Sequence, residues 1–471
     1  MKTIDKIYIN GAFVTPHGTE LFDLVNPTTN ELLSKVVLGD EEDTRKAIAS
    51  AKAAFIHFSK TTKEERIAYL QKMYEAVAKR KDELTAIMVQ EYGGTLQFSR
   101  ASTQHALNGI QSTIETLTNF DFVRNIGKSK VRLEPLGVVG IITPWNASNS
   151  FICNKLATAI AAGCTAVIKP SEMSALQTQV LLECLHEAGL PAGVFNLVNG
   201  LGNVVGAEIT RHPDIAKISF TGSTVVGKTI ARGAVDTMKR ITLELGGKSP
   251  NIILDDADLQ KAIPTAVAAA FMNSGQACIA GTRLLVPENR LDEIKTLVKE
   301  TVEKVKVGDP KNEDTAVGPM VSKKQFARVQ QYIDLGVQEG AEILTGGAGQ
   351  PEGLEAGNFV KPTVFVNVNN DMRIAREEIF GPVLSIITYK NEEDAINIAN
   401  DTDYGLQAYV SSSDSSRANR VAAQINAGRV LINGLNHDPM APFGGFKQSG
   451  IGREFGVYGL EAYVEAKAVI E

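Results

Sequence analysis

Hydrophobic and polar positions along the chain change their spacing near Val138. Upstream, the segment from Glu65 to Leu84 repeats apolar residues at helical intervals between lysines and arginines, which predicts one surface helix. From Val138 onward, short apolar runs alternate with helix-like stretches, a pattern typical of βαβ units and of a parallel sheet covered on both faces. The runs are VVGII, TAVI, VFNLV, KISF and RITLEL, and the helix-like stretches centre on Ala157, Val180, Val205 and Ile230.

A second alternating series begins after Gly246 and Gly247. It predicts helices near Ala266, Ile294 and Ile396, and strands near Leu384, Tyr409 and Leu431. A second α/β domain is the simplest interpretation. The last residues, YVEAKAVIE, predict an isolated strand with nothing of its own to pair with. Such a strand indicates an edge that is added to another sheet, and hence an oligomer.

Composition narrows the class of protein. A chain of 471 residues with 44% hydrophobic content is too long to fold around one small hydrophobic core, so two or three domains are expected. The net charge is -6, and no long run of one sign occurs, so the sequence does not indicate a basic surface for nucleic acid or an anionic membrane. The start, MKTIDKIYINGAF, lacks the apolar core of a secretory signal, and no uncharged stretch is long enough to span a bilayer. We therefore expect a cytoplasmic protein whose partners are small molecules.

The four cysteines, Cys153, Cys164, Cys184 and Cys278, are spaced irregularly, and the six histidines lie apart from them. With no C-x-x-C pair, this spacing argues against a disulfide framework and against a metal site. Free thiols are typical of a reducing compartment. The segment NSGQACIAGTR places Cys278 among small residues after a helical pattern, where a thiol can be exposed beside backbone N–H groups. From this context alone, Cys278 is either a nucleophile or a small buried hydrophobic residue like the other three.

The segment KISFTGSTVVGKT contains a glycine loop with two interpretations. From Gly222 to Thr229 it fits the P-loop pattern of nucleotide triphosphatases, and the run NIILDD, ending at Asp255 and Asp256, resembles their metal-holding acid. Alternatively, Gly222 lets the backbone approach a dinucleotide whose pyrophosphate faces the next helix N-terminus. Glu244, 22 residues later, then stands where such a site places its ribose-binding acid. Both interpretations put an anion at this loop.

The whole chain, from INGAFV near the N-terminus to the last strand, resembles the aldehyde dehydrogenase superfamily of the NAD(P)-dependent, hydrolytic, non-acylating type. Seven motifs occur in the order found in that family. They are TPWNAS around Asn146, IKPSE around Lys169 and Glu172, FTGS at Gly222, LELGGKSP at Glu244, GQAC at Cys278, EEIFGPV at Glu378, and PFGGFKQSGIGRE from Pro442.

The resemblance implies that Cys278 is the nucleophile and Glu244 the general base, while the Asn146 amide and the Cys278 backbone N–H form the oxyanion hole. A thiohemiacetal on Cys278 would then lose hydride to a nicotinamide, and water activated by Glu244 would hydrolyse the resulting thioester. The expected reaction is oxidation of an aldehyde to a carboxylic acid. Acyl transfer to coenzyme A or phosphate is the alternative, but it has little need of a hydrolytic base. The triphosphatase interpretation loses weight, because the family places Lys228 on a helix that the dinucleotide only borders.

The resemblance also implies the cofactor residues. Lys169 and Glu172 would bind the adenosine ribose, which frees Glu244 for the thioester. The pyrophosphate would face Ser223 and the helix after Gly222, and the nicotinamide end would be held by Glu378 and Phe380, with Trp145 in the same site. NAD is expected to be preferred, because the Glu172 charge repels a 2′-phosphate. NADP remains possible because Lys169 stands beside the same hydroxyls.

For the substrate pocket, the resemblance points to Ala147, Ala277, Ile279 and His437. Ala147 stands where the family often has an aromatic residue, so a wider tunnel wall is expected. Ala277 and Ile279 flank the nucleophile, and His437 lies near the mouth. The sequence shows no arginine that would fix a carboxylated aldehyde.

The implied fold class is α/β and aldehyde dehydrogenase-like, with a Rossmann-type cofactor domain, a second α/β catalytic domain and a small oligomerisation strand arm. The chain is expected to assemble as a homodimer or homotetramer. The expected divisions are 1–116 and 136–246 for the cofactor domain, 247–450 for the catalytic domain, 117–135 and 460–471 for the arm, and 451–459 for a segment returning to the cofactor domain.

Overall fold

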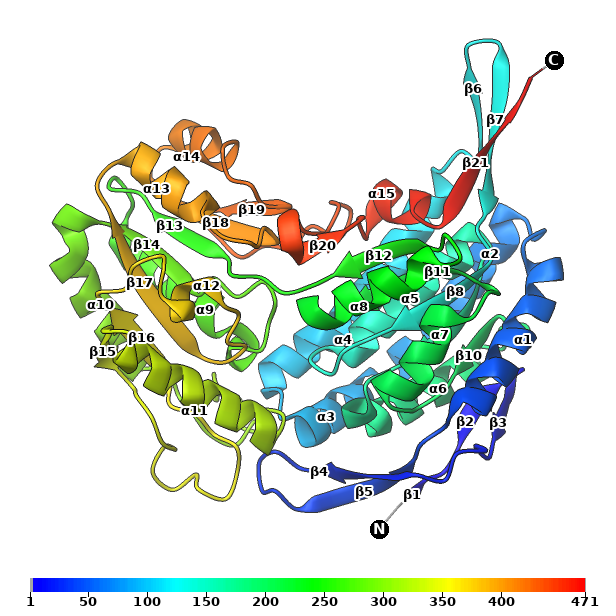
Figure 1. Ribbon diagram of the computed structural model, residues 1–471, viewed down its shortest axis with the longest axis horizontal. Coiled ribbons are helices and arrows are strands. Elements are labelled where there is room, and N and C mark those ends of the chain that lie inside the picture. Colours follow the sequence, from blue (N-terminus) through cyan, green and yellow to red (C-terminus); the bar gives the residue numbers. More distant parts are fainter. Residues whose placement is uncertain (1–2, 471) are drawn as a thin grey trace.

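The computed structural model describes residues 3–470, and these residues form two lobes, each built on one large β-sheet (Figure 1). The chain crosses from the first lobe to the second after β12, and its last part returns to the first lobe at β20. A small sheet projects from the first lobe as an arm. None of the helices described is long and apolar enough to cross a membrane.

The first lobe contains an eight-stranded sheet whose central strands are parallel. Its strands, in spatial order, are β20 (Gly450–Ile451), β12 (Arg240–Glu244), β11 (Ile215–Thr221), β8 (Val138–Ile142), β9 (Thr165–Lys169), β10 (Phe195–Leu197), β2 (Ile7–Ile9) and β3 (Ala12–Val14). The antiparallel strands β20, β2 and β3 lie at the two edges. The five apolar runs predicted to be strands are confirmed.

Alternate residues of these strands enter two different hydrophobic cores. Val139 and Ile141 of β8 belong to one core, and Val138 and Ile142 to the other. The first core is covered by α2 (Lys63–Lys79), α4 (Leu96–Thr118), α5 (Ser148–Ala162) and α6 (Ala175–Glu187); the second by α1 (Glu41–Phe58), α7 (Ala207–Arg211) and α8 (Thr224–Val235). The sheet is therefore covered on both faces, as predicted.

The second lobe contains a seven-stranded sheet that is parallel except for β15. Its order is β15 (Glu342–Thr345), β16 (Thr363–Val366), β17 (Val383–Tyr389), β14 (Arg283–Pro287), β13 (Pro250–Ile253), β18 (Gln407–Ser411) and β19 (Arg429–Ile432). One face packs on α9 (Leu259–Phe271) and α10 (Leu291–Glu303); the other on α11 (Lys323–Gln338), α12 (Arg373–Arg376), α13 (Glu392–Asn400) and α14 (Ser415–Ala422). The predicted second α/β series is confirmed.

The single helix predicted from Glu65 to Leu84 is wrong. The segment divides into α2 and α3 (Lys81–Tyr92), because Arg80 leaves the helical conformation with φ -113° and ψ 20°. The Arg80 side chain also pairs with Glu83 and, on α6, with Glu183. The break is thus held in place by contacts that a periodic pattern cannot show.

The prediction that the last strand has nothing of its own to pair with is also wrong. The strand β21 (Val464–Val469) pairs antiparallel with β7 (Ser129–Pro135), which pairs with β6 (Val123–Ile126). The β6–β7 hairpin mixes charged and apolar residues on both faces, so it gives no alternating signal. The outer edge of β21 carries no strand among the described residues, and Glu471 lies outside them. The remaining elements are α15 (Gly456–Glu461) and a small sheet of β1 (Thr3–Ile4), β5 (Leu32–Val37) and β4 (Leu21–Val25).

The two large sheets bring opposite strand ends together at the seam between the lobes. The carboxyl ends of β8, β9, β11 and β12 lead to Asn146, Lys169, Gly222 and Glu244. From the other lobe, segments at the amino ends of β14, β17, β18 and β19 carry Cys278, Glu378, Gln407 and Arg429. In open α/β sheets, the carboxyl ends of the strands are the usual place for ligands.

Candidate active site

Two cavities meet at Cys278. The first has a volume of about 610 Å³, and the second a volume of about 330 Å³. Cys278, Asn146 and Phe151 line both of them. The first cavity also contains Trp145, Gly222, Ser223, Glu244, Glu378 and Phe380. The second contains Ala147, Ala277, Ile279 and His437. Most of the residues predicted for the site are therefore brought together around one thiol.

The loop that presents Cys278 is held from both lobes by Gln276. The buried Gln276 side chain donates to the Tyr92 hydroxyl at 3.2 Å and to the Pro319 carbonyl at 3.3 Å, and it accepts from Val321 N at 3.0 Å. Asn273, in the same loop, has φ 51° and accepts a hydrogen bond from the Tyr92 hydroxyl at 2.8 Å. Strained backbone of this kind persists only where its surroundings determine it. Nothing in the sequence pattern indicated this role of Tyr92.

The glycine pair after Glu244 allows close packing against the nucleophile. A Cβ atom at Gly247 would lie 2.3 Å from the Cys278 carbonyl oxygen. A Cβ at Gly246 would lie 2.8 Å from Glu378 Oε2, and Glu378 Oε1 accepts from Gly247 N at 3.0 Å. At Gly247 the clash is with backbone, so only glycine fits there, whereas a side chain at Gly246 would displace the Glu378 carboxyl.

Burial raises the pKa of the Cys278 thiol, and the neighbouring Glu378 and Glu244 carboxyls raise it further. The thiol is thus held as S–H in the absence of ligands, and a proton acceptor is needed before it can act as a nucleophile. All four cysteines are free, and Cys153, Cys164 and Cys184 are buried in the core, as expected for residues that only pack.

Glu244 is the last residue of β12 and is only 2% exposed. Neither of its carboxyl oxygens has a hydrogen-bond partner within the described chain. Burial raises the pKa of Glu244 well above its usual range, Glu454 raises it further, and Lys155 opposes the shift. A buried carboxyl without partners costs stability, and such groups are concentrated at functional sites.

Lys155 and Glu454 form a buried ion pair behind Glu244. Lys155 also donates to the Ser219 hydroxyl at 3.1 Å, so the pair is anchored to β11. The sequence analysis missed both residues. A signal for Lys155 was present, because it is a lone charge within the apolar helix α5. Glu454 lies within the quoted motif PFGGFKQSGIGRE but was given no role.

Asn146 follows β8 and is buried. Its side-chain amide nitrogen donates to the Gln276 backbone carbonyl at 2.9 Å. The Asn146 backbone carbonyl accepts from the side-chain amide of Asn273 at 3.3 Å. A side-chain amide has two N–H groups, so one donor is left for a ligand oxygen. Asn146 is thereby fixed next to the loop that carries Cys278.

The residues predicted to face the cofactor's phosphates and nicotinamide line the larger cavity. Ser223 is the N-cap of α8 and accepts from Val226 N at 3.4 Å, so the start of α8 faces this space. A Cβ at Gly222 would lie 2.5 Å from the Phe220 ring. The rings of Trp145 and Phe380 meet edge to face, with centroids 5.4 Å apart, and Phe380 has φ 64°. This wall combines backbone donors with aromatic surface.

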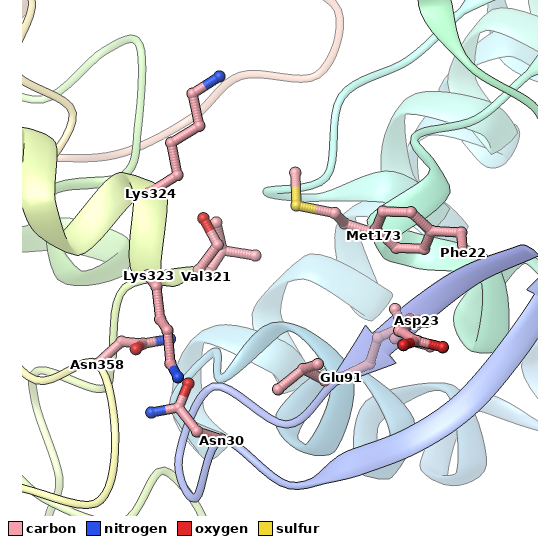
Figure 2. A pocket seen from close by; sticks show the side chains of 12 residues that line it. Phe22, Asp23, Asn30, Glu91, Met173, Val321, Lys323, Lys324 and Asn358 are labelled. Carbon is pink, nitrogen blue, oxygen red and sulfur yellow. The ribbon is translucent and has the colours of Figure 1, made fainter.

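Lys169 and Glu172 lie apart from this cavity's lining. Lys169 Nζ donates to Glu172 Oε2 at 3.2 Å and to the Pro170 carbonyl at 2.9 Å. A third cavity, of about 310 Å³, opens beside Met173, directly after Glu172. Figure 2 shows its walls coming from both lobes, with Lys323 on one side and Phe22 on the other. The seam between the lobes is thus open next to the predicted ribose-binding carboxylate.

The structure rules out the triphosphatase interpretation. Lys228 is exposed and donates to Gln448 Oε1 at 2.7 Å. Asp256 lies in the other lobe, where it accepts from the Ser412 hydroxyl at 2.7 Å and pairs with Arg417 at 3.0 Å. The two halves of the supposed triphosphate site therefore belong to different sheets.

The sequence showed no arginine that would fix a carboxylated aldehyde, but the structure places one arginine in the wall of the substrate pocket. Arg429, the first residue of β19, lines the 330 Å³ cavity together with Cys278. Its guanidinium lies over the Phe443 ring, 5.4 Å from the centroid. The sequence could not show this, because the position depends on how β19 pairs with β18 in the folded sheet.

Comparison with known proteins connects this geometry to a family. The sequence profile of the aldehyde dehydrogenase family matches residues 13–469. A relative from Staphylococcus haemolyticus, provisionally named an aldehyde dehydrogenase, is 44% identical over 100% of this chain and 99% of its own length. The chain belongs to the aldehyde dehydrogenase family. The family oxidises aldehydes with a nicotinamide cofactor, so the predicted reaction class is confirmed for this aldehyde dehydrogenase.

Solved structures agree with this assignment. Aldehyde dehydrogenase C of Pseudomonas syringae, in complex with NAD+ and octanal, is 45% identical with a TM-score of 0.97, covering 99% of this chain and 96% of that one. Betaine aldehyde dehydrogenase of Staphylococcus aureus, in complex with NAD+, is 36% identical with a TM-score of 0.96, covering 99% of this chain and 94% of that one. The predicted fold class is therefore confirmed for this enzyme.

Proposed function

We propose that this aldehyde dehydrogenase uses NAD+ to convert an aldehyde to a carboxylic acid through a thioester on Cys278, which water activated by Glu244 hydrolyses. The observation that carries the proposal is the shared position of Cys278 in two cavities. A carbon attached to its sulfur lies where a cofactor in one cavity and a substrate in the other meet. The NAD+ and octanal bound by the Pseudomonas syringae relative support this division.

The residues of the larger cavity suit a dinucleotide. Its volume of about 610 Å³ lies in the range of ligand pockets, and the α8 N-terminus offers backbone N–H groups to a pyrophosphate. Phe380 and Trp145 provide an aromatic wall, and Glu378 an acceptor. When bound, the nicotinamide ring accepts the hydride that leaves the thiohemiacetal carbon. We infer NAD preference from the Glu172 carboxylate, with Lys169 leaving room for some use of NADP.

In the first half-reaction, the Cys278 proton passes to Glu244, and the thiolate sulfur bonds to the aldehyde carbon. The aldehyde oxygen becomes an alkoxide that the free N–H of the Asn146 amide and the Cys278 backbone N–H stabilise. Once the thioester has formed, Glu244 releases this proton to solvent. In the second half-reaction, Glu244 takes a proton from water, the hydroxide attacks the thioester carbon, and the carbon–sulfur bond breaks to give a thiolate that takes the proton back from Glu244. Because Glu244 is buried and unpartnered at this point, we infer hydrolysis rather than acyl transfer to coenzyme A or phosphate.

We also propose that the chain forms a homodimer or homotetramer through the arm, and that the two lobes and the arm correspond to the domain limits given above. The outer edge of β21 supports the first proposal. Apolar side chains are exposed there and nearby, with Ile126 61%, Val469 41% and Ile470 78% exposed. An unprotected edge with apolar side chains favours association with another strand.

The test is a series of aldehydes of graded length and charge, offered with NAD or NADP while reduced cofactor is followed by absorbance.

Cys278→Ala should abolish turnover and leave NAD affinity nearly unchanged, because the thiol takes part in chemistry rather than cofactor binding. Cys153→Ala is the matched control and should keep turnover, since Cys153 only packs in the core. Iodoacetamide should label Cys278. Full activity of Cys278→Ala, or labelling at another cysteine, would exclude the covalent mechanism.

A further inference from the structure

Arg429 is a positive charge without a partner in the cavity that the proposed function gives to the aldehyde. Within residues 3–470, its side chain has no hydrogen-bond acceptor and no carboxylate at ion-pair distance. The Arg429 guanidinium lies over the Phe443 ring. Burial lowers the pKa of Arg429, and Tyr409 and the more distant Asp438 oppose that shift. The guanidinium stays charged at neutral pH, because an arginine pKa starts far above that range.

Other buried arginines of the chain are satisfied by the protein itself. The Arg283 guanidinium donates to the carbonyls of Lys248, Ile398 and Ala399 and to the Asn370 side chain. Arg66 donates to two carbonyls and to the Thr61 hydroxyl. These arginines hold the fold together. The donors of Arg429, by contrast, are left for a group that enters the cavity.

The neighbouring strand adds a second unsatisfied group on the same wall. Gln407 of β18 is the register partner of Arg429, and both line the cavity. The Gln407 Nε2 donates to the Tyr409 hydroxyl, which donates to the Ile279 carbonyl at 2.8 Å, next to the nucleophile. The Gln407 Oε1 is buried and has no partner within the described chain. This oxygen is an acceptor enclosed by protein, so the polar groups that the wall offers a ligand are the donors of Arg429, which favour a ligand with an anionic end.

The charge on this wall comes from Arg429 rather than from the histidines of the same cavity. His437 and His105 lie with ring centroids 5.6 Å apart near its mouth. Burial, Arg429 and His105 lower the pKa of His437 to about 4. His437 is therefore neutral at physiological pH. The carboxylate of Glu454, which also lines the cavity, is paired with Lys155, so Arg429 is left as the unpaired charge on this wall.

Resting on the proposed function, we propose that the substrate is an aldehyde that carries a carboxylate at its other end, and that Arg429 binds this carboxylate. A guanidinium matches a carboxylate with two parallel hydrogen bonds. Apolar residues that line the same cavity, such as Phe151, Leu431 and Phe455, would contact the carbon chain, and Cys278 would receive the aldehyde carbon. Arg429 is thus a specificity-determining residue for the anionic end.

The experiment compares matched pairs of aldehydes with equal chain length, one ending in a methyl group and one in a carboxylate, over a graded series of lengths. For the wild-type enzyme with NAD, kcat/KM should favour the carboxylated member by about tenfold or more at the best length. Arg429→Gln should lower kcat/KM for that member by at least about tenfold and for the methyl-terminated member by less. Arg429→Lys, which keeps the charge but not the fork, should fall between them. Arg420→Gln, which changes an exposed arginine on α14, is the matched control and should preserve the wild-type ratio.

A second measurement uses only the wild-type enzyme. A dicarboxylate should inhibit turnover at a lower concentration than the monocarboxylate of equal length, because it presents an anion to Arg429. A wild-type preference for methyl-terminated aldehydes at every length, or equal losses for both members in Arg429→Gln, would overturn the inference and leave the proposed function intact. Absence of reduced cofactor with every aldehyde would instead refute the proposed function, and the inference with it.

Discussion

Glu244, the proposed general base, carries the first prediction at the residue scale. Its carboxyl is buried without a partner and has a raised pKa. In Glu244→Gln, size and hydrogen bonding are kept, but the side chain cannot accept a proton near neutral pH. We expect up to one equivalent of reduced cofactor per site, followed by turnover at least about 100-fold slower than wild type.

Rapid-mixing absorbance and intact-protein mass test this expectation together, the second by detecting the acyl group on Cys278. The burst will be smaller to the extent that Glu244 also deprotonates the thiol. The raised pKa adds a pH dependence, because a base works only when deprotonated. Steady-state turnover of the wild-type enzyme should therefore rise as pH increases through that raised pKa, and the variant should lack this rise. Wild-type turnover by Glu244→Gln without a trapped adduct would remove Glu244 from its assigned role.

Glu172 gives the residue-scale prediction for the cofactor. Its carboxylate accepts a hydrogen bond from Lys169, so the pair is fixed at the end of β9. Glu172→Gln should lower the ratio of kcat/KM for NAD to that for NADP by about tenfold, because a repulsive charge near the 2′-phosphate is removed. Glu187→Gln, an exposed carboxylate on α6, is the control. If wild type itself prefers NADP, the Glu172 side chain does not face the ribose.

At the scale of elements, regular periodicity could be predicted from the sequence and pairing could not. The buried strands from β8 to β12 were visible because both faces of a parallel sheet are apolar. The pairing of β21 with β7 was missed because both strands carry charged residues on an exposed arm. Cys278, Asn146 and Glu244 were found through the order of motifs. Arg429 was missed because its place in the cavity wall depends on the pairing of β19 with β18, which the sequence pattern does not show.

The loop between α9 and β14 carries the prediction for an element. Its strained residues are held by Gln276, whose side chain satisfies groups from both lobes. Gln276→Ala should destabilise the protein by about 2–4 kcal/mol, because it removes three hydrogen bonds and leaves buried partners unsatisfied. It should also lower kcat by at least about tenfold, because small shifts of a nucleophile are costly. Thermal unfolding and steady-state kinetics measure the two effects, with Gln104→Ala on the surface of α4 as control. Unchanged kcat would show that Cys278 is positioned by other contacts.

At the scale of the whole molecule, the proposed active site and the proposed interface lie on different parts of the chain. The lobes meet at the seam that contains Cys278, while the arm projects away from that seam (Figure 1). The arm is a small sheet of three strands whose residues are all exposed or half-buried, so it buries little apolar surface of its own. Its exposed apolar side chains therefore favour contact with a second copy of the chain.

The double variant Val469→Glu with Ile470→Glu tests that contact without touching the active site. Two carboxylates placed at the outer edge of the arm would have to be buried in an interface, which is unfavourable without partners. We expect wild type to form a dimer or tetramer by light scattering and the double variant to have a smaller molar mass. Val337→Glu on α11 is the matched control, because Val337 is 52% exposed on a helix of the second lobe, whereas the arm belongs to the first. The residues around Cys278 all belong to a single chain, so the species of smaller molar mass should still be labelled at Cys278 by iodoacetamide. A monomeric wild type, or an unchanged mass in the double variant, would exclude the arm as the interface.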